Sequence, residues 1–443
     1  MLKVKLFLWM VLSFFLYGYA NAQVAGIPIA NCIDLKNIAL DMTANYYLMS
    51  DLDCAAEEAN PFRPIEGVFI GTLNGHGHAI SHIDIINENG EKSKSTGLFR
   101  ELGPQSKISN IDFHEISLIA HDDALRGLIA GTATGPVEVH NVHIQGLQIL
   151  RYDLSRPPYL PDKQKDIGVS GGIFGLTTGD VLLDDVHIGE EVLMQQNAFV
   201  GGLIGAAQGH TLIVRSSATQ LRIQGGKTCD NPQNECGFGG LIGLIGKFEP
   251  SKHKAKHMQA DMRQHYHVKI HQSYAKGSGI SHKNMGGLVG LVKLDRSLQI
   301  RNSYSTVDIT CGNTGTAFDS CKYAGGIIGQ AKQGSGQQPI SLENVYAAGL
   351  VDLDGDEHGR AIIGHGQQAG STRVKSPANT QSYFDTDTTQ KQHSGDKVSK
   401  GLPSVEMQVA APDREDRPFF AWDGSIWFFK NGYYPSLIDV GIK

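Results

Sequence analysis

Long apolar runs are scarce in this sequence. Only residues 6–19 form a sustained apolar stretch, and it is shorter than the roughly 18 residues expected of a membrane-spanning helix. Lys3 and Lys5 precede this stretch and the small-residue triplet 20–22 follows it, an order typical of a cleavable signal peptide. We therefore expect cleavage after Ala22, export to the periplasm, cell surface or medium, and a mature chain without a membrane span.

An excess of positive charge is also missing. The chain has 39 Lys and Arg against 45 Asp and Glu, a net charge of −6, and loss of Lys3 and Lys5 with the signal peptide makes the mature chain more acidic. This balance argues against a nucleic-acid partner. The H-E-x-x-H, C-x-x-C and G-x-G-x-x-G motifs are absent as well. The sequence therefore implies no cofactor and assigns no catalytic residue.

Cysteine is sparse, with six residues in the chain, all after the expected cleavage site. An exported protein meets an oxidising environment, which favours disulfides. Closeness in sequence favours the pairs Cys32–Cys54, Cys229–Cys236 and Cys311–Cys321, although six cysteines allow about fifteen pairings. A zinc site is the alternative, but no two cysteines have C-x-x-C spacing.

Glycine, in contrast, is abundant, and many of the 53 glycines recur in one short phrase. The phrase reads GGIFG at 171–175, GGLIG at 201–205 and 239–243, GGLVG at 286–290 and GGIIG at 325–329. Weaker copies begin at Thr96, Arg126 and Arg360. Glycine at such positions permits tight corners and close approach of backbones.

A second phrase follows each copy and centres on a polar residue flanked by alternating apolar or small residues. The polar residues are His82, Asn110, Asn141, Asp185, Arg215, Gln272, Asn302, Asn344 and Gln381. The alternation predicts strands with one buried face, and its change of phase at the polar residue predicts a corner. We expect the asparagines to lie over one another and form a hydrogen-bonded ladder.

One repeat of about 30 residues cannot bury its own apolar face, so successive copies must stack. We therefore predict an all-β fold, a right-handed single-stranded parallel β-helix of the pectin-lyase-like type with caps at both ends. After the signal peptide, the expected parts are an N-terminal cap with the entry strand (23–66), the β-helix (67–390) and an aromatic C-terminal cap (391–443). Loop insertions are expected at 150–168, 226–237, 246–271, 309–322 and 352–359.

The repeat resembles that of the GLUG-motif proteins, exported and cell-surface proteins of bacteria. The similarity includes the entry segments YLMSDLD at 47–53 and FIGTLNGHGHAI at 69–80, and the exit segments YFDTD at 383–387 and GLPSVEM at 401–407. The resemblance implies a β-helix and, for some members, adhesion or surface display. It implies no shared catalytic residues.

The position two residues after each corner should point outward. Its first members are Asp84, Asp112, His143 and His187. Carboxylates on adjacent coils would lie about 5 Å apart, near the separation in retaining glycosidases. These four residues are candidates for an acid–base or metal site, and a row of solvated polar residues is the alternative.

The same column continues with Tyr274, Tyr304, Tyr346 and Tyr383. Exposed tyrosine rings could stack on sugars or on a partner, whereas the alternative is a structural ladder in which the rings stabilise one another.

The insertions offer further candidates because loops on a rigid scaffold commonly carry recognition. Lys252, Lys254 and Lys256, with His253 and His257, form a basic, histidine-rich patch suited to an acidic glycan or a transition metal, or simply a solvated loop. Asp352, Asp354 and Asp356 resemble the opening of a Ca²⁺ loop, but Ile363 stands where the bidentate glutamate is required.

These features favour a non-catalytic binding or adhesion protein whose partner is a glycan or a cell-surface protein. A polysaccharide lyase or glycoside hydrolase acting from the outer face is the alternative. The sequence does not indicate the oligomeric state.

Overall fold

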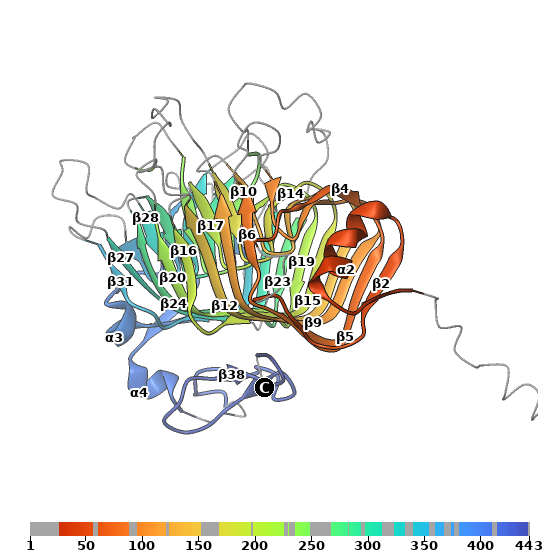
Figure 1. Cartoon of the computed structure of the whole chain (residues 1–443). Coiled ribbons are helices and arrows are strands. Elements are labelled where there is room, and N and C mark those ends of the chain that lie inside the picture. The colour runs from red at the N-terminus through yellow and green to blue at the C-terminus, as the bar shows by residue number, and fades with distance from the viewer. Residues whose placement is uncertain are drawn as a thin grey trace, which may run out of the picture.

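The computed structural model describes most of the chain after residue 25 (Figure 1). The described ranges are 26–55, 61–87, 95–120, 124–151, 168–195, 198–225, 229, 235–248, 267–281, 283–293, 297–311, 323–332, 340–353, 359–366, 374–375, 381–409 and 414–441. The expected signal peptide lies outside them. Within these ranges, no helix is long and apolar enough to cross a membrane.

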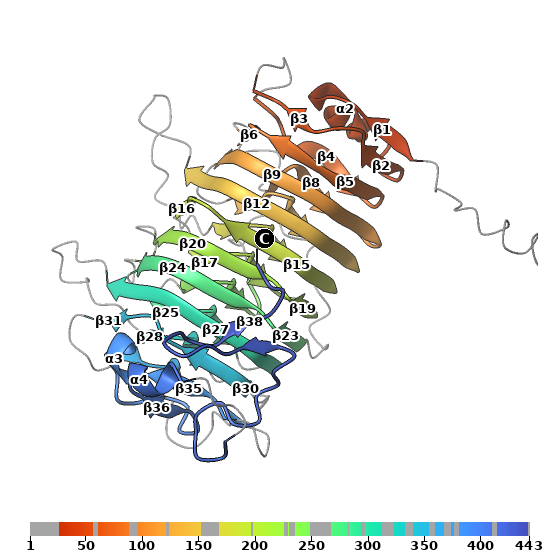
Figure 2. The ribbon, with the colours of Figure 1, turned by 90° about the horizontal axis from the view of Figure 1, so that it is seen from below.

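Parallel strands stack in three sheets, so the predicted parallel β-helix is confirmed (Figures 1 and 2). The 19-stranded sheet, here the long sheet, contains β1 (Ile27–Ile29), β2 (Asn45–Leu48), β3 (Leu52–Asp53), β5 (Thr72–Ser81), β6 (Asp84–Asn87), β9 (Ser106–Ala120), β12 (Val137–Arg151), β15 (Val181–Gly189), β16 (Val192–Gln195), β19 (Thr211–Val214), β20 (Ser217–Gln224), β23 (His267–His271), β24 (Tyr274–Ser281), β27 (Ser297–Cys311), β30 (Ile340–Ala347), β31 (Val351–Asp352), β34 (Val374–Lys375), β35 (Tyr383–Asp385) and β36 (Lys400–Leu402).

Two narrower sheets complete each coil. The eight-stranded sheet contains β7 (Ser95–Thr96), β10 (Leu125–Arg126), β13 (Val169–Gly171), β17 (Phe199–Gly201), β21 (Gly237–Gly239), β25 (Asn284–Gly286), β28 (Tyr323–Gly325) and β32 (Gly359–Arg360). The nine-stranded sheet contains β4 (Ile65–Phe69), β8 (Phe99–Leu102), β11 (Ala130–Ala133), β14 (Phe174–Thr177), β18 (Ile204–Ala207), β22 (Ile242–Ile245), β26 (Val289–Lys293), β29 (Ile328–Lys332) and β33 (Ile363–Gly366).

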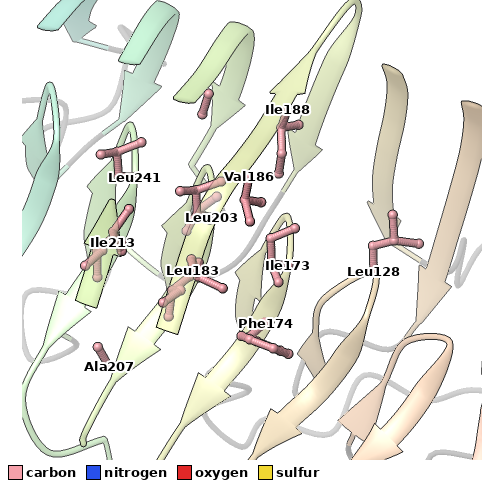
Figure 3. Close-up of a cluster of buried hydrophobic side chains, with 14 of the residues drawn as sticks. Leu128, Ile173, Phe174, Leu183, Val186, Ile188, Leu203, Ala207, Ile213 and Leu241 are labelled. Atoms are coloured by element: carbon pink, nitrogen blue, oxygen red, sulfur yellow. The ribbon is translucent and has the colours of Figure 1, made fainter. Parts of the chain in front are cut away.

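The core lies inside the coils, where aliphatic side chains of the long sheet meet those of the narrow sheets. Figure 3 shows Leu183 and Ile213 of the long sheet turned into the same interior as Ile173 and Leu203. All four side chains have no solvent exposure. Leu183 pairs with Ile213 across neighbouring coils, so the apolar columns of the repeat lie in register.

The glycine phrase forms the corner between the two narrow sheets. A Cβ added to Gly201 would lie 2.0 Å from the carbonyl oxygen of Ile204, which is too close for any side chain. The next residue, Gly202, approaches Gly240 of the following coil, with 2.1 Å from an added Cβ to the Gly240 oxygen. The recurrence of glycine is therefore a steric requirement of stacking.

Corner residues of the long sheet adopt left-handed backbone angles, and their amides form the expected ladder. Asn141 donates through Nδ2 to Asn110 Oδ1 at 2.9 Å, and Asn110 donates to Asn74 at 3.1 Å. Farther along, Asn344 donates to Asn302 at 3.1 Å. Asn110 has φ of 55° and Asn302 has φ of 47°, a region that asparagine tolerates better than most residues.

The first coil does not follow the predicted register. Leu73, rather than Ile80, pairs with Ile108, and the register shifts between Asn74 and His78. His82 consequently lies one corner later than predicted, where its Nε2 is 3.2 Å from Glu115. The long sheet bends twice in each of these coils, at His76 and His82 in the first and at Asn110 and Glu115 in the second. The repeat alignment is wrong for this coil because it matched the second bend of the first coil to the first bend of the next.

Short helices precede the first coil. At the N-terminal end, α2 (Cys32–Asn37) and the 3-10 helix η1 (Ile38–Leu40) precede β2, and a disulfide links Cys32 to Cys54. The Cys229–Cys236 disulfide is also present, so two predicted pairs are confirmed. Cys321 lies outside the described residues, so the third pair remains a prediction.

Two short helices, α3 (Thr386–Thr389) and α4 (Ser404–Met407), follow the last coil. Residues 414–441, here the closing segment, then run back beneath the long sheet (Figures 1 and 2). This segment contains the antiparallel pair β37 (Trp427–Phe428) and β38 (Ser436–Leu437). The aromatic cap was expected over the terminal coil, but it covers the side of several coils.

Candidate functional site

The outward side of the long sheet, here the long face, carries the column predicted from the sequence. Strand registers align it from the second coil onward as Asp112, His143, His187, Ser217, Tyr274, Tyr304, Tyr346 and Tyr383. The residues follow one another on adjacent coils. Their chemistry divides the face into a polar half and a tyrosine half.

Asp84 is not part of this column. Asp112 pairs with Ala79 across the first two coils, whereas Asp84 pairs with Ser117. Asp84 follows the second bend of its coil, at His82, whereas Asp112 follows the first bend of the next coil, at Asn110. The predicted pair of adjacent carboxylates at Asp84 and Asp112, and with it the glycosidase-like spacing, is therefore wrong.

Asp112 and His143 form the exposed part of the polar half. Asp112 Oδ1 lies 2.9 Å from His143 Nδ1, and the side chains are 40% and 28% exposed. The His143 ring stacks on that of His187 with centroids 5.4 Å apart. A carboxylate and an imidazole in contact, both reachable from solvent, provide hydrogen-bonding groups for a polar ligand.

His187 is buried, contrary to the expected exposure of the column. Its Nδ1 is 2.8 Å from Ser217 Oγ and its Nε2 is 2.9 Å from Asp185 Oδ1. Burial lowers the pKa of His187, against the opposing effect of the hydrogen bond with Asp185. The neutral imidazole donates one hydrogen bond and accepts another, so it fits between Asp185 and Ser217 as a structural link.

The arrangement Asp185–His187–Ser217 has the members of a hydrolase triad, but Ser217 is only 1% exposed. A nucleophile must reach its substrate, and here no substrate carbonyl could approach the hydroxyl. In this structure these residues therefore form a hydrogen-bonded structural link on the coils that follow the exposed Asp112–His143 pair.

A second polar row runs beside the first on the same face. His140 lies between two carboxylates, with Glu138 3.3 Å from Nε2 and Asp184 3.5 Å from Nδ1. Arg215 holds Asp184 through both oxygens at 2.6 and 2.8 Å. The hydrogen bond from Lys107 lowers the pKa of Glu138, which keeps this carboxylate ionised. The sequence-level column did not include this row, although the same alternation places it outward.

The tyrosines form a stacked ladder. Tyr304 lies 4.8 Å from both Tyr274 and Tyr346, with nearly parallel rings. All four column tyrosines are buried, at 8% exposure or less. An exposed tyrosine surface at Tyr274, Tyr304, Tyr346 and Tyr383 is therefore a wrong prediction, because alternation assigns a side of the sheet and does not show what covers it.

The closing segment covers the tyrosine half. Trp427, which is 1% exposed, lies 6.2 Å from the Tyr304 ring and 6.0 Å from the Tyr346 ring. Trp422 and Phe419 pack on Tyr383. Burial raises the pKa of Tyr304 far above its ordinary value, so the ladder stays neutral.

Hydrogen bonds attach the closing segment both to the tyrosine ladder and to the last coil. The Tyr346 hydroxyl donates to the backbone oxygen of Pro435 at 2.7 Å. Tyr434 donates to Asp385 Oδ2, and Ser404 donates to the same oxygen at 2.7 Å. Asp385 also caps α3 through Oδ1. This buried carboxylate therefore joins the last coil, α4 and the closing segment.

Most loop candidates lie outside the described residues. These are Lys252, His253, Lys254, Lys256, His257, Asp354 and Asp356. Asp352 ends β31, is exposed, and has neither of its expected calcium-loop partners among the residues that the structure describes. Over the described ranges, no three His, Cys, Asp or Glu side chains gather closely enough to hold a metal ion.

One serine motif escaped the sequence survey. Residues 168–172 read GVSGG, which matches the G-x-S-x-G phrase of serine hydrolases. Ser170 lies inside β13, is 1% exposed, and is followed by a corner and another strand. A nucleophile elbow requires a strand, a sharp turn and a helix, so this serine belongs to the repeat.

Comparison with known proteins gives few matches. No family model matches the sequence. A stretch of 122 residues is 30% identical to Halomucin of Haloquadratum walsbyi, covering 24% of this chain and 1% of Halomucin. The chain therefore corresponds to a very small part of that curated relative.

Two solved structures give weak structural matches to the chain. A "putative immunoglobulin A1 protease" from Bacteroides ovatus gives a TM-score of 0.41 at 15% identity, over 94% of both chains. A structure named IgA1 Protease gives 0.46 at 18% identity, over 80% of this chain and 21% of the other. None of these similarities assigns an activity to the chain.

Proposed function

We propose that the protein is an exported, non-catalytic binding protein that holds a glycan against the polar half of its long face. The proposal is carried by the difference in exposure between the polar half and the tyrosine half of the long face. The closing segment buries the tyrosines, whereas Asp112, His140, His143 and Asp184 keep partly exposed polar atoms on neighbouring coils. Rigidly held carboxylates and imidazoles suit the hydroxyl groups of a sugar chain.

Export and family membership are part of the same proposal. The N-terminal 22 residues have the order of a signal peptide, and two disulfides suit an oxidising compartment. We also propose that the chain is a GLUG-motif protein, since its glycine phrase serves the corner of each coil. Display of a repetitive surface to a glycan or a cell-surface partner follows from these assignments.

The test is a panel of neutral and acidic polysaccharides, with binding and turnover measured on the same mature protein. We expect binding without new reducing ends or unsaturated products. Replacement of both Asp112 and His143 by alanine should weaken binding about tenfold or more, because two hydrogen-bonding groups are lost. The exposed Glu415→Ala variant should bind normally and serves as the control.

Two results would contradict the proposal. Turnover that disappears in Asp112→Asn would favour a polysaccharide lyase or glycoside hydrolase. Equal binding by the double variant and the wild-type protein would show that the polar half is not the binding surface.

A further inference from the structure

The long sheet has an open strand edge at each end within the part of the chain that the structure describes. At the N-terminal end β3 pairs only with β5, and at the C-terminal end β36 pairs only with β35. Figure 2 shows β3 and β36 at opposite ends of the solenoid. Unpaired strand edges are templates for pairing with another chain. Each end of the molecule therefore offers a surface for contact with a second protein surface.

Both ends also expose large apolar side chains. At the N-terminal end, Ile33 of α2 is 50% exposed, Leu40 of η1 is 85% exposed, and Met49, which directly follows β2, is 56% exposed. At the C-terminal end, Val398 and Val405 flank β36 and are 38% and 73% exposed. Exposed apolar side chains that gather on a soluble protein mark interaction sites. Contact between the two ends would remove these side chains from water.

The exposed charges beside the two strand edges have opposite signs. At the N-terminal end, the carboxylates of Asp51 and Asp53 flank and end β3, and both side chains are exposed. At the C-terminal end, the exposed charged side chains of residues 390–402 are those of Lys397 and Lys400. The N-terminal end of the long sheet is therefore acidic at its edge, and the C-terminal end is basic.

Lys400 and Asp51 lie at the two ends of one column of the long face. Lys400 pairs with Tyr383, the last tyrosine of the ladder. At the other end the same column begins with Ala79, which pairs with Asp112. The Ala79 N–H donates to Asp51 Oδ1 at 3.0 Å, so this carboxylate lies beside the start of the column. A second copy that continued the column would bring its Asp51 carboxylate next to the Lys400 ammonium group.

We propose that the N-terminal end of one copy binds the C-terminal end of a second copy, so that the protein assembles head to tail. Contact between two N-terminal ends would bring carboxylates together, and contact between two C-terminal ends would bring ammonium groups together. A head-to-tail contact leaves one free end on each outer copy, so it can extend into a row. The inference goes beyond the proposed glycan binding and does not rest on it.

Sedimentation velocity of the mature protein over a range of concentrations, at low and high salt, measures this association. The mass of the wild-type protein should rise with concentration, and less so at high salt because ion pairs are screened. Lys397→Glu with Lys400→Glu should weaken association about tenfold or more. Arg222→Glu with Lys269→Glu makes the same charge change at exposed residues of middle coils and should associate like the wild-type protein.

A second variant changes the other end. Leu40→Ser should weaken association about tenfold, because a largely exposed leucine loses its burial in the contact. Ile280→Ser changes a side chain of β24 that is 46% exposed, away from both ends, and serves as the control. An equimolar mixture of Leu40→Ser with the double lysine variant should form dimers and no longer rows, because each variant keeps one intact end.

Four results would overturn the proposal. The first is a monomeric mass of the wild-type protein at every concentration in low salt. The second is undiminished association of the double lysine variant alone, which would indicate contact between two N-terminal ends. The third is undiminished association of Leu40→Ser alone, which would indicate contact between two C-terminal ends. The fourth is an equimolar mixture of the two variants that contains no dimers.

Discussion

Single residues at the corners carry the strictest steric demands in this protein. The glycine that ends β17 faces a carbonyl oxygen of its own corner, and the same approach recurs at Gly171, Gly239, Gly286 and Gly325. No rotamer choice relieves such a contact, because the conflict arises at Cβ. At these positions even the replacement of glycine by alanine should destabilise the fold.

Gly201→Ala should therefore destabilise the fold by about 3 kcal/mol, the upper end for overpacking. The cause is the 2.0 Å separation between the added Cβ and the Ile204 oxygen. Gly424→Ala is the matched control, since nothing lies within 4 Å of its added Cβ. Chemical denaturation of both variants measures the difference, and equal stability would contradict the steric account.

The buried His187 predicts how the stability of the folded protein depends on pH. Because burial lowers its pKa below the ordinary value of 6.5, the unfolded chain binds a proton more readily than the folded chain. Its contribution to stability is complete above pH 6.5 and is lost as the pH falls through that value towards the lowered pKa. His271, also lowered chiefly by burial, acts in the same direction, whereas the raised pKa of the exposed His82 acts weakly against it.

The unfolding temperature should accordingly fall between about pH 7.5 and about pH 5. His187→Gln keeps hydrogen-bonding groups without a titrating one, so its profile should be flatter than that of the wild-type protein. Differential scanning calorimetry across this range provides the measurement. Parallel profiles for the two proteins would show that His187 does not titrate in this window.

At the scale of elements, neighbouring residues of β37 in the closing segment face opposite ways, one towards the tyrosine ladder and the next towards solvent. Trp427 points into the tyrosine ladder, whereas Phe428, the next residue of β37, is 55% exposed. Trp427→Ala should cost about 3–5 kcal/mol because a large buried ring is lost. Phe428→Ala is the adjacent control and should have little effect. Thermal unfolding compares the two variants, and similar losses of stability would argue against Trp427 as the residue that holds the closing segment on the ladder.

Removal of most of the closing segment should have a larger effect than either substitution. Truncation before Trp422 removes both tryptophans and uncovers much of the tyrosine ladder as an apolar strip, so we expect aggregation. In the full mature chain, the fluorescence of Trp422 and Trp427 should be blue-shifted and resist quenching by iodide, since both indoles are buried. A soluble, monomeric truncated protein would mean that the ladder does not need its cover.

Sequence alternation predicted the strand columns correctly from the second coil onward, even where a long insertion separates Ser217 from its partner Tyr274. Asn110, Asn141 and their successors align as expected, as do the apolar columns from Ile108 onward. The method failed at Asp84, because each coil of the long sheet has two bends with similar alternation around them, and His82 at the second bend was matched to Asn110 at a first bend. It also failed for the tyrosines, because contacts between distant segments are not encoded in local periodicity.

At the scale of the whole molecule, the coils form a one-dimensional stack closed by caps. If the N-terminal residues act as proposed, the mature protein should begin at residue 23. Expression of the full chain in a bacterium with a periplasm, followed by intact mass spectrometry of the exported fraction, provides the check. Retention of residues 1–22 in the exported protein would show that they are not a cleaved signal.

The closing segment also limits how the protein can change in length. Solenoids commonly gain or lose whole repeats. The closing segment meets tyrosines on four successive coils, from Phe419 against Tyr383 to Gly441 beside Tyr274. Insertion of one coil among them would displace one end by about 4.8 Å, and a single continuous segment could no longer fit both. Repeat number is therefore free to vary in evolution ahead of Ser217 and fixed after it.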